Sequence, residues 1–308
     1  MSHAESDLPS DAAIVSQQGV GARLLRKEDD RFMRGRGQYV ADIRLAGMQD
    51  VAFVRSPLAH ARIRAIHVPE RYRDVVFTAA DLTGIKPIRA VSGLPGFKIS
   101  EQPILATGKV RHVGELVAMC MAPTRAEAED IAASVTLDLE ELPAVYDMRR
   151  ARDAGIALVH EHWGDNVFLE SAFEVDITAA FDAPIKVTRE ISTARQCMSP
   201  LEGRGVVATF DHRLDQLTLY TGAQMPHIVR NGLSDCMGMD QGQIGIVSPD
   251  IGGGGWPQGN SAAGRGLPGL ARDAQGLHRA LDRGPARAPD GERQLPRAPL
   301  QDHCLCRS

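Results

Sequence analysis

A run of four glycines, Gly252 to Gly255, is the part of the sequence best suited to holding a charged ligand. It comes shortly after the apolar residues 244–247, which predict a strand. Consecutive glycines reach backbone conformations closed to other residues, so their amides can converge on an anion such as a phosphate. A flexible loop is the alternative, and spacing alone does not separate the two. The run is neither a GxGxxG fingerprint nor a P-loop, since no Lys-Ser or Lys-Thr pair follows it.

Four other features carry groups that could take part in chemistry. Gln224 stands in a loop before a predicted helix, where its side chain could contact a polar cofactor atom or simply cap the helix. Glu202 lies between apolar segments, but a single carboxylate does not define a mechanism. His227 has no second ligand at a suitable spacing, and the HCLC stretch at 303–306 has no upstream partner pair. The sequence therefore predicts no metal site formed by side chains.

The first half of the chain alternates between strand and helix signals. Thr124, followed by Glu127 three positions later, predicts a capping box at the start of a helix. The other predicted elements are a short helix over 79–82 and strands over 51–54, 63–68, 75–78, 110–121 and 137–142. This mixture predicts an α+β domain.

The second half supplies the elements that must position Gln224 and the glycines. Residues 144–168 carry mixed turn signals and predict a linker. Pro226 is well placed at the start of a helix. The predicted elements are strands over 185–193, 205–210, 216–221 and 244–247 and a helix over 226–239.

Composition bounds the class of protein. A chain of 308 residues is long enough for two domains. Its net charge of −4 argues against a nucleic-acid-binding protein, which usually carries a basic surplus. No apolar run has the length of a membrane span, and the N-terminus lacks the pattern of an export signal. Five scattered cysteines do not form a disulfide framework, so we expect a reducing, cytoplasmic setting and no membrane partner.

Seven short motifs occur in one order along the chain: GRGQYVADI (35–43), RSPLAHARI (55–63), GKVRHVGELVA (108–118), ELPAVYD (141–147), SPLEGRG (199–205), TGAQMPH (221–227) and VSPDIGGG (247–254). Together they resemble the molybdenum-cofactor-binding large subunit of the xanthine dehydrogenase and aldehyde oxidase family, in its carbon-monoxide-dehydrogenase-like branch. The first four resemble the a/b hammerhead domain, and the last three resemble the start of the molybdopterin-binding domain.

The resemblance implies an oxidoreductase that hydroxylates an aldehyde or N-heterocycle, or oxidises CO, with water as the oxygen source. It implies molybdenum bound to molybdopterin, in bacteria as the cytosine dinucleotide. Partner subunits, a small one with 2Fe-2S clusters and a medium one with FAD, are implied as electron acceptors. Gln224 matches the family glutamine that contacts a molybdenum oxo ligand, and Gly252, Gly253 and Gly254 match the loop that holds the cofactor through its backbone. The catalytic glutamate of the family is expected beyond the resembling segment, so no catalytic residue is assigned.

The family pattern stops at Gly255. From there to Ser308 the chain has no Val, Ile, Met, Phe, Tyr, Thr or Lys, which predicts disorder. Back-translating the tail and reading it one nucleotide later restores family-like residues, most continuously over 287–304. We therefore expect a frameshift near residues 254–256.

These observations predict four parts: a disordered lead (1–19), a hammerhead domain (20–150), a truncated start of the molybdopterin-binding domain (151–254) and an out-of-frame tail (255–308). One functional hypothesis is a fragment of a molybdenum hydroxylase large subunit. The alternative is an inactive remnant, a hammerhead domain able only to bind partner subunits. A third hypothesis is a natural short protein whose Arg- and Pro-rich tail binds an acidic partner.

Overall fold

The computed structural model describes residues 25–172, 176, 178–181, 184–194, 201–253 and 303–307. Contacts divide the chain into two units, residues 1–38 and 39–308. In the first unit the described residues hold one short helix, α2 (Asp29–Met33), with two aspartates in its first turn. Acidic side chains at that end complement the helix dipole. None of the described helices is long and apolar enough to cross a membrane.

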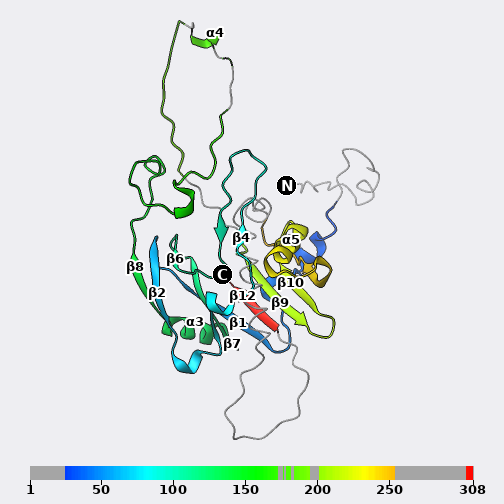
Figure 1. Ribbon diagram of the computed structural model, residues 1–308. Helices are drawn as coiled ribbons and strands as arrows, with labels where there is room; N and C mark the ends of the chain where they lie inside the picture. Colours follow the sequence, from blue (N-terminus) through cyan, green and yellow to red (C-terminus); the bar gives the residue numbers. More distant parts are fainter. Residues whose placement is uncertain are drawn as a thin grey trace, which may run out of the picture. The chain divides into compact units, whose positions relative to one another are not determined.

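A seven-stranded mixed sheet forms the centre of the second unit. Its strand order is β11-β10-β9-β12-β1-β7-β3. The strands are β1 (Met48–Arg55), β3 (Val76–Thr78), β7 (Leu116–Ala122), β9 (Gly205–Asp211), β10 (Gln216–Thr221), β11 (Ile244–Val247) and β12 (His303–Arg307). Strands from the predicted hammerhead segment and from the predicted molybdopterin-binding segment therefore share one sheet (Figure 1).

Strand β7 shows why this sheet forms. All seven of its residues are buried, because it lies between β1 and β3 and is covered on both faces. Met119 packs in the cluster that includes Val229 and Leu233 of helix α5 (Pro226–Met237). Cys120, pointing the opposite way, packs in the cluster that includes Ile131 of helix α3 (Arg125–Ser134). The two helices thus cover opposite faces, and each large apolar side chain buried between layers contributes about 1.5–3 kcal/mol.

Helix starts follow the expected local chemistry. The hydroxyl of Thr124 accepts the N–H of Glu127 at 3.3 Å, so the predicted N-cap of α3 is confirmed. The Thr124 hydroxyl in turn donates to the Glu127 carboxylate at 3.1 Å. In a full capping box that carboxylate would instead accept the backbone N–H of Thr124. Pro226 is the first residue of α5. The helix ends at Met237, and Gly238 caps it in a left-handed conformation with a φ of 70°.

Two smaller sheets and several 3-10 turns complete the unit. One sheet has the order β6-β2-β8, and the other pairs β4 with β5. Their strands are β2 (Ala61–His67), β4 (Ile88–Arg89), β5 (Glu101–Gln102), β6 (Lys109–Val110) and β8 (Thr136–Glu141). The remaining elements are α4 (Thr178–Phe181) and the 3-10 helices η1 (Val40–Asp42), η2 (Glu70–Tyr72), η3 (Ala79–Asp81), η4 (Glu161–Trp163) and η5 (Gln241–Gln243).

Three predicted elements differ from the structure. The strand expected over 110–121 is divided into β6 and β7, because a turn at Gly114, with φ 81°, redirects the chain. The helix expected over 79–82 is the 3-10 helix η3. No strand occurs over 185–193, where Ile185, Val187 and Ile191 are all strongly exposed. Apolar alternation makes a strand only when a neighbouring strand pairs with it, and the described residues supply none there.

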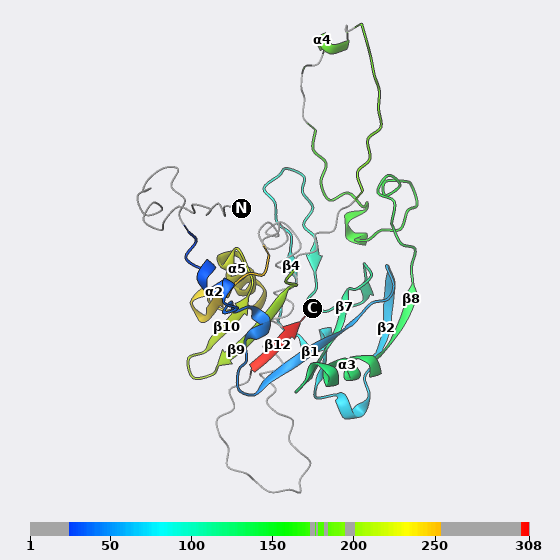
Figure 2. The same cartoon turned by 180° about the vertical axis from the view of Figure 1, so that it is seen from behind.

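The expected disorder of the tail also needs a correction. Residues 254–302 and 308 lie outside the described part of the chain, as does the predicted lead at 1–19. Residues 303–307, however, form β12, which pairs parallel with β1 and antiparallel with β9 (Figure 2). The facing edges of β1 and β9 present backbone donors and acceptors, and a short extended segment between them satisfies both rows.

Candidate functional site

Two loops of the candidate site leave the same edge of the large sheet. Strands β10 and β11 are parallel neighbours, with Tyr220 opposite Val247. The loop after β10 carries Gln224, and the loop after β11 carries the glycine run. The hydroxyl of Ser248 donates to the carbonyl oxygen of Ala223 at 2.8 Å and ties the loops together. Crevices outside the carboxyl ends of such strands are common ligand sites in α/β sheets.

Glu202 connects these loops to the segment that precedes β9. Its backbone N–H donates to the carbonyl oxygen of Gly252 at 2.9 Å. Its carboxylate Oε2 accepts the N–H of Gly252 at 2.6 Å. The same oxygen lies 3.5 Å from the position that a Cβ would take on Gly222. The sequence indicates no partner for the Glu202 carboxylate. In the structure it lies close to both loops, at Gly252 and at Gly222.

The glycine loop has a shape that other residues would not allow. A Cβ on Gly252 would lie 2.8 Å from Cβ of Glu202 and 3.4 Å from Cε1 of Tyr39. Gly253 has a φ of 117°, a conformation that L side chains rarely adopt. Glycine is therefore required at both positions by the local packing and backbone, independently of any ligand. Gly254 lies outside the described residues.

Gln224 presents a free carboxamide at this edge. It is exposed and lies two residues before α5 begins. No hydrogen bond of its side chain occurs with any residue that the structure describes. Its amide group can both donate and accept, so it is available to a polar ligand. His227, the second residue of α5, is exposed, and no group of potential metal ligands occurs among the described residues.

The shape of the site fits a molybdopterin, but the glycine amides are already hydrogen-bonded within the chain. Gln224 and the glycines share an edge, and the absence of side chains lets a ligand approach closely. However, Gly252 N–H already donates to Glu202, and Gly253 N–H donates to the carbonyl oxygen of Ile251 at 3.0 Å. These two amides reach a cofactor only if their present acceptors are displaced. Gln224 is thus the residue of this edge that is available to a ligand, whereas the Gly252 amide is bound by Glu202.

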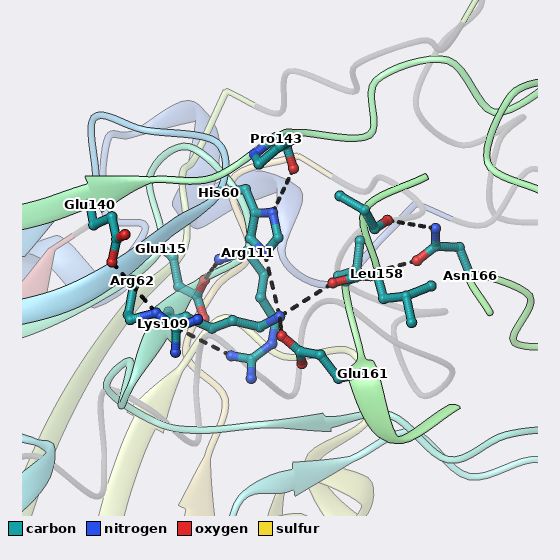
Figure 3. A network of polar contacts seen from close by, with 12 residues as sticks. His60, Arg62, Lys109, Arg111, Glu115, Glu140, Pro143, Leu158, Glu161 and Asn166 are labelled. Carbon is teal, nitrogen blue, oxygen red and sulfur yellow. Dashed lines mark hydrogen bonds and ion pairs between the residues drawn. The ribbon is translucent and has the colours of Figure 1, made fainter. Parts of the chain in front are cut away.

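A second polar cluster, which the sequence analysis does not predict, holds the linker (residues 144–168) against the three-stranded sheet β6-β2-β8. Lys109 is buried, and its Nζ donates to Glu161 Oε1 at 2.6 Å and to the carbonyl oxygen of Leu158 at 3.4 Å (Figure 3). The pKa of the Glu161 carboxyl is lowered, first by this hydrogen bond. Lys109 lies in the GKVRHVGELVA motif, but Glu161 is 52 positions away and outside every motif, so only the folded chain reveals the pair.

His60 completes this cluster in one defined tautomer. Its Nδ1 lies 2.7 Å from the carbonyl oxygen of Pro143, and its Nε2 lies 3.3 Å from Lys109 Nζ. Because a carbonyl oxygen only accepts, Nδ1 carries the proton and Nε2 accepts from the lysine. The cluster is therefore a structural clamp that joins β6 to residues 143, 158 and 161.

Two family models match the chain in succession. The model described as "Aldehyde oxidase and xanthine dehydrogenase, a/b hammerhead domain" matches residues 34–143. The "Molybdopterin cofactor-binding domain" model matches residues 159–255. The second match contains the glycine loop, Glu202 and Gln224.

Individual relatives agree with these matches. The chain is 35% identical to the nicotine 6-hydroxylase large subunit of Paenarthrobacter nicotinovorans over 247 residues, which are 78% of this chain and 30% of that protein. It is 33% identical to the carbon monoxide dehydrogenase large chain of Hydrogenophaga pseudoflava over 265 residues, covering 80% of this chain and 32% of that one. The chain thus spans about a third of the length of these relatives.

A solved structure shows the same arrangement. Quinoline 2-oxidoreductase from Pseudomonas putida 86 superposes with a TM-score of 0.78 and 32% identity, over 92% of this chain and 34% of that one. The expected α+β class, with a hammerhead domain followed by part of a cofactor-binding domain, is confirmed. The chain belongs to the xanthine dehydrogenase and aldehyde oxidase family of molybdenum hydroxylases, and it matches the N-terminal part of their large subunits.

Proposed function

We propose that this chain forms one wall of a molybdopterin site in a molybdenum-dependent oxidoreductase. The observation that carries the proposal is that Gln224 and the loop of Gly252 and Gly253 lie at one edge of the sheet, where the Gln224 carboxamide bonds to none of the described residues. Gln224 would hold the cofactor through its carboxamide. Gly252, Gly253 and Gly254 would hold it, in bacteria in its cytosine dinucleotide form, through their backbone.

The reaction proposed for the complete assembly is oxidation of an aldehyde, an N-heterocycle or CO. The cofactor, when bound, transfers a water-derived oxygen to the substrate carbon and takes up two electrons. The overall reaction releases two electrons and two protons for each water consumed. We propose a small subunit with 2Fe-2S clusters and a medium subunit with FAD as the electron acceptors. Buried thiols at Cys120 and Cys236 support a reducing, cytoplasmic setting.

Metal content tests this proposal directly. The protein is purified from cells that make the molybdenum cofactor, and molybdenum and pterin are measured per chain. We expect both in the wild type and a clear loss in Gln224→Ala. Gln241→Ala is the control, because Gln241 is also an exposed glutamine but lies before β11, away from the candidate edge. Two results contradict the proposal: a molybdenum content of the wild type no higher than background, or an equal molybdenum content in Gln224→Ala and Gln241→Ala.

The second candidate function is the cofactor-free remnant that binds partner subunits only. The hydrogen bond from Gly252 N–H to Glu202 favours it, because that amide is already satisfied within the chain. The abrupt loss of β-branched residues after Gly255 favours it too, and we propose a frameshift there. Sequencing the gene across the Gly255 codon tests the frameshift. A protein without molybdenum that still co-purifies with the 2Fe-2S or FAD subunit supports the remnant.

A further inference from the structure

A separate cavity lies beside the small two-stranded sheet. Its volume is about 360 Å³, within the range of about 300–1,000 Å³ typical of small-molecule sites. None of the residues of the glycine-loop site lines it. Its walls come from η3 and the segment that follows, from residues 101–107, from Arg111 after β6, and from the turn at η4. One wall is fixed to the end of α5, since Lys86 N–H donates to the carbonyl oxygen of Cys236 at 2.9 Å.

The cavity is lined by apolar side chains and by basic or imidazole side chains. Leu82, Ile104 and Leu105 are buried and belong to one apolar cluster. The basic or imidazole residues of the lining are Lys86, Arg111, His160 and His162. Among the described residues, Glu101 is the one carboxylate of the lining, and its Oε1 already lies 3.4 Å from Nε of Arg89.

Among the basic residues of the lining, Arg111 has a buried nitrogen, Nε, without a hydrogen-bond partner among the described residues. Its Nη1 makes only a long contact of 3.4 Å to the carbonyl oxygen of Lys109. A guanidinium is always charged and has five donors, so a partly buried one with so few acceptors is stabilised by an added anion.

The neighbouring carboxylates bind other donors and leave the Arg111 guanidinium without a direct carboxylate contact among the described residues. Glu161 is bound to Lys109 at 2.6 Å, and Glu115 accepts the backbone N–H of Arg111 at 2.5 Å. Neither forms an ion pair with the Arg111 guanidinium among the described contacts. The pKa of His160 is lowered, first by burial and then by the positive charge of Arg111. The cavity thus combines a guanidinium donor that has no partner among the described residues with apolar side chains.

We propose that this cavity binds a small organic monocarboxylate. The carboxylate pairs with the Arg111 guanidinium, assisted by Lys86, and the apolar body of the ligand lies on Leu82, Ile104 and Leu105. Planar guanidinium groups bind carboxylates through paired hydrogen bonds, which favours this ligand class over a simple halide. An inorganic phosphate has no apolar part that could contact Leu82, Ile104 and Leu105. The proposal stands independently of the molybdopterin site.

Tryptophan fluorescence can test this binding, because Trp163 lies beside the cavity with its ring centroid 4.3 Å from that of His160. Trp256→Phe removes the only other tryptophan and isolates the signal. Benzoate is the probe, and benzamide is its neutral counterpart of similar shape. We expect saturable binding of benzoate, with benzamide about tenfold weaker or more.

The variants separate charge recognition from general effects. Arg111→Gln should weaken benzoate binding about tenfold or more, whereas Arg111→Lys should retain part of it. Arg125→Gln is the control, since Arg125 is exposed and pairs with Glu129 on α3 at 2.6 Å. Equal affinity for benzoate and benzamide, unchanged binding by Arg111→Gln, or no saturation up to about 10 mM benzoate would overturn the proposal.

NMR of the wild type locates the binding site without depending on whether a variant folds. Amide chemical-shift changes in the wild type on adding benzoate should gather at residues 79–87, 101–111 and 160–163. Changes centred elsewhere contradict the assigned site, whatever the variants do. Circular dichroism of each variant confirms that the fold is retained.

Discussion

Glu202 and Gly252 form a paired contact in which each residue donates one backbone N–H to the other. The N–H of Glu202 donates to the Gly252 carbonyl oxygen at 2.9 Å, and the N–H of Gly252 donates to the Glu202 carboxylate at 2.6 Å. A carboxylate that receives a glycine amide occupies the position in which a phosphate oxygen would be an acceptor. We therefore propose that a cofactor must displace Glu202 before it can accept the Gly252 N–H.

Removing the carboxylate should change both stability and cofactor content. Glu202→Ala leaves the Gly252 N–H without its acceptor, and we expect a loss of about 1–3 kcal/mol in the free energy of unfolding. Glu202→Gln keeps an acceptor oxygen and should lose less. Urea unfolding gives these values, and molybdenum analysis gives the second readout. A gain of molybdenum in Glu202→Ala identifies Glu202 as a competitor of the cofactor, and a loss identifies it as a positioning residue for the loop. Equal stability of all three proteins would contradict the role given to this contact.

Side chains at the glycines should be poorly tolerated even without a cofactor. In Gly252→Ala the new Cβ would lie 2.8 Å from Cβ of Glu202, so a shift of the loop costs about 1–3 kcal/mol. Gly93→Ala is the matched control, because nothing lies within 4 Å of its Cβ position. Urea unfolding of both variants checks the prediction. An equal effect at the two positions would mean that the contact with Glu202 does not restrict Gly252.

His160 should make stability depend on pH in a defined direction. Its pKa is lowered from 6.5, first by burial, so the folded chain binds this proton less readily than the unfolded chain. Stability is therefore highest above pH 6.5 and falls as the pH drops through that value, because the unfolded state gains the proton first. His160→Gln should reduce this slope in urea unfolding from pH 8 to 5.

Cys120 should resist thiol reagents in the folded protein. It is fully buried in β7, and burial raises the pKa of its thiol to about 12. Thiolate is the reactive form, so alkylation at pH 8 should occur only after unfolding. Peptide mass spectrometry after iodoacetamide treatment, with and without urea, measures this at Cys120 separately from the other cysteines. Rapid labelling without urea would show that β7 opens.

Residues 184–194 should be the first described segment cut by trypsin. Lys186 and Arg189 lie in an exposed stretch without strand or helix, which can enter a protease site. Lys109, buried and bound to Glu161, is the internal control. Limited proteolysis with mass spectrometry gives the order of cleavage. Early protection of residues 184–194 would show that another chain or segment covers them in solution.

Local patterns in the sequence were enough to find the elements around the site. The continuous apolar run of β7, the Thr124 cap of α3 and Pro226 at the start of α5 each depend on residues close together in the chain. The family also followed from short motifs, because each keeps its residues within one loop or strand. Such features record backbone preference and periodicity, which neighbours along the chain determine.

Only the tertiary structure decided which loops meet and which groups are already used. The pairing of β10 with β11 brings Gln224 and Gly252 to one edge, and Glu202 reaches Gly252 across 50 positions of sequence. Lys109 finds Glu161 across 52 positions, and the apolar alternation of 185–193 remains without a pairing strand. Strand order, register and available partners fix these outcomes, and none of them is written in the residues next to the site.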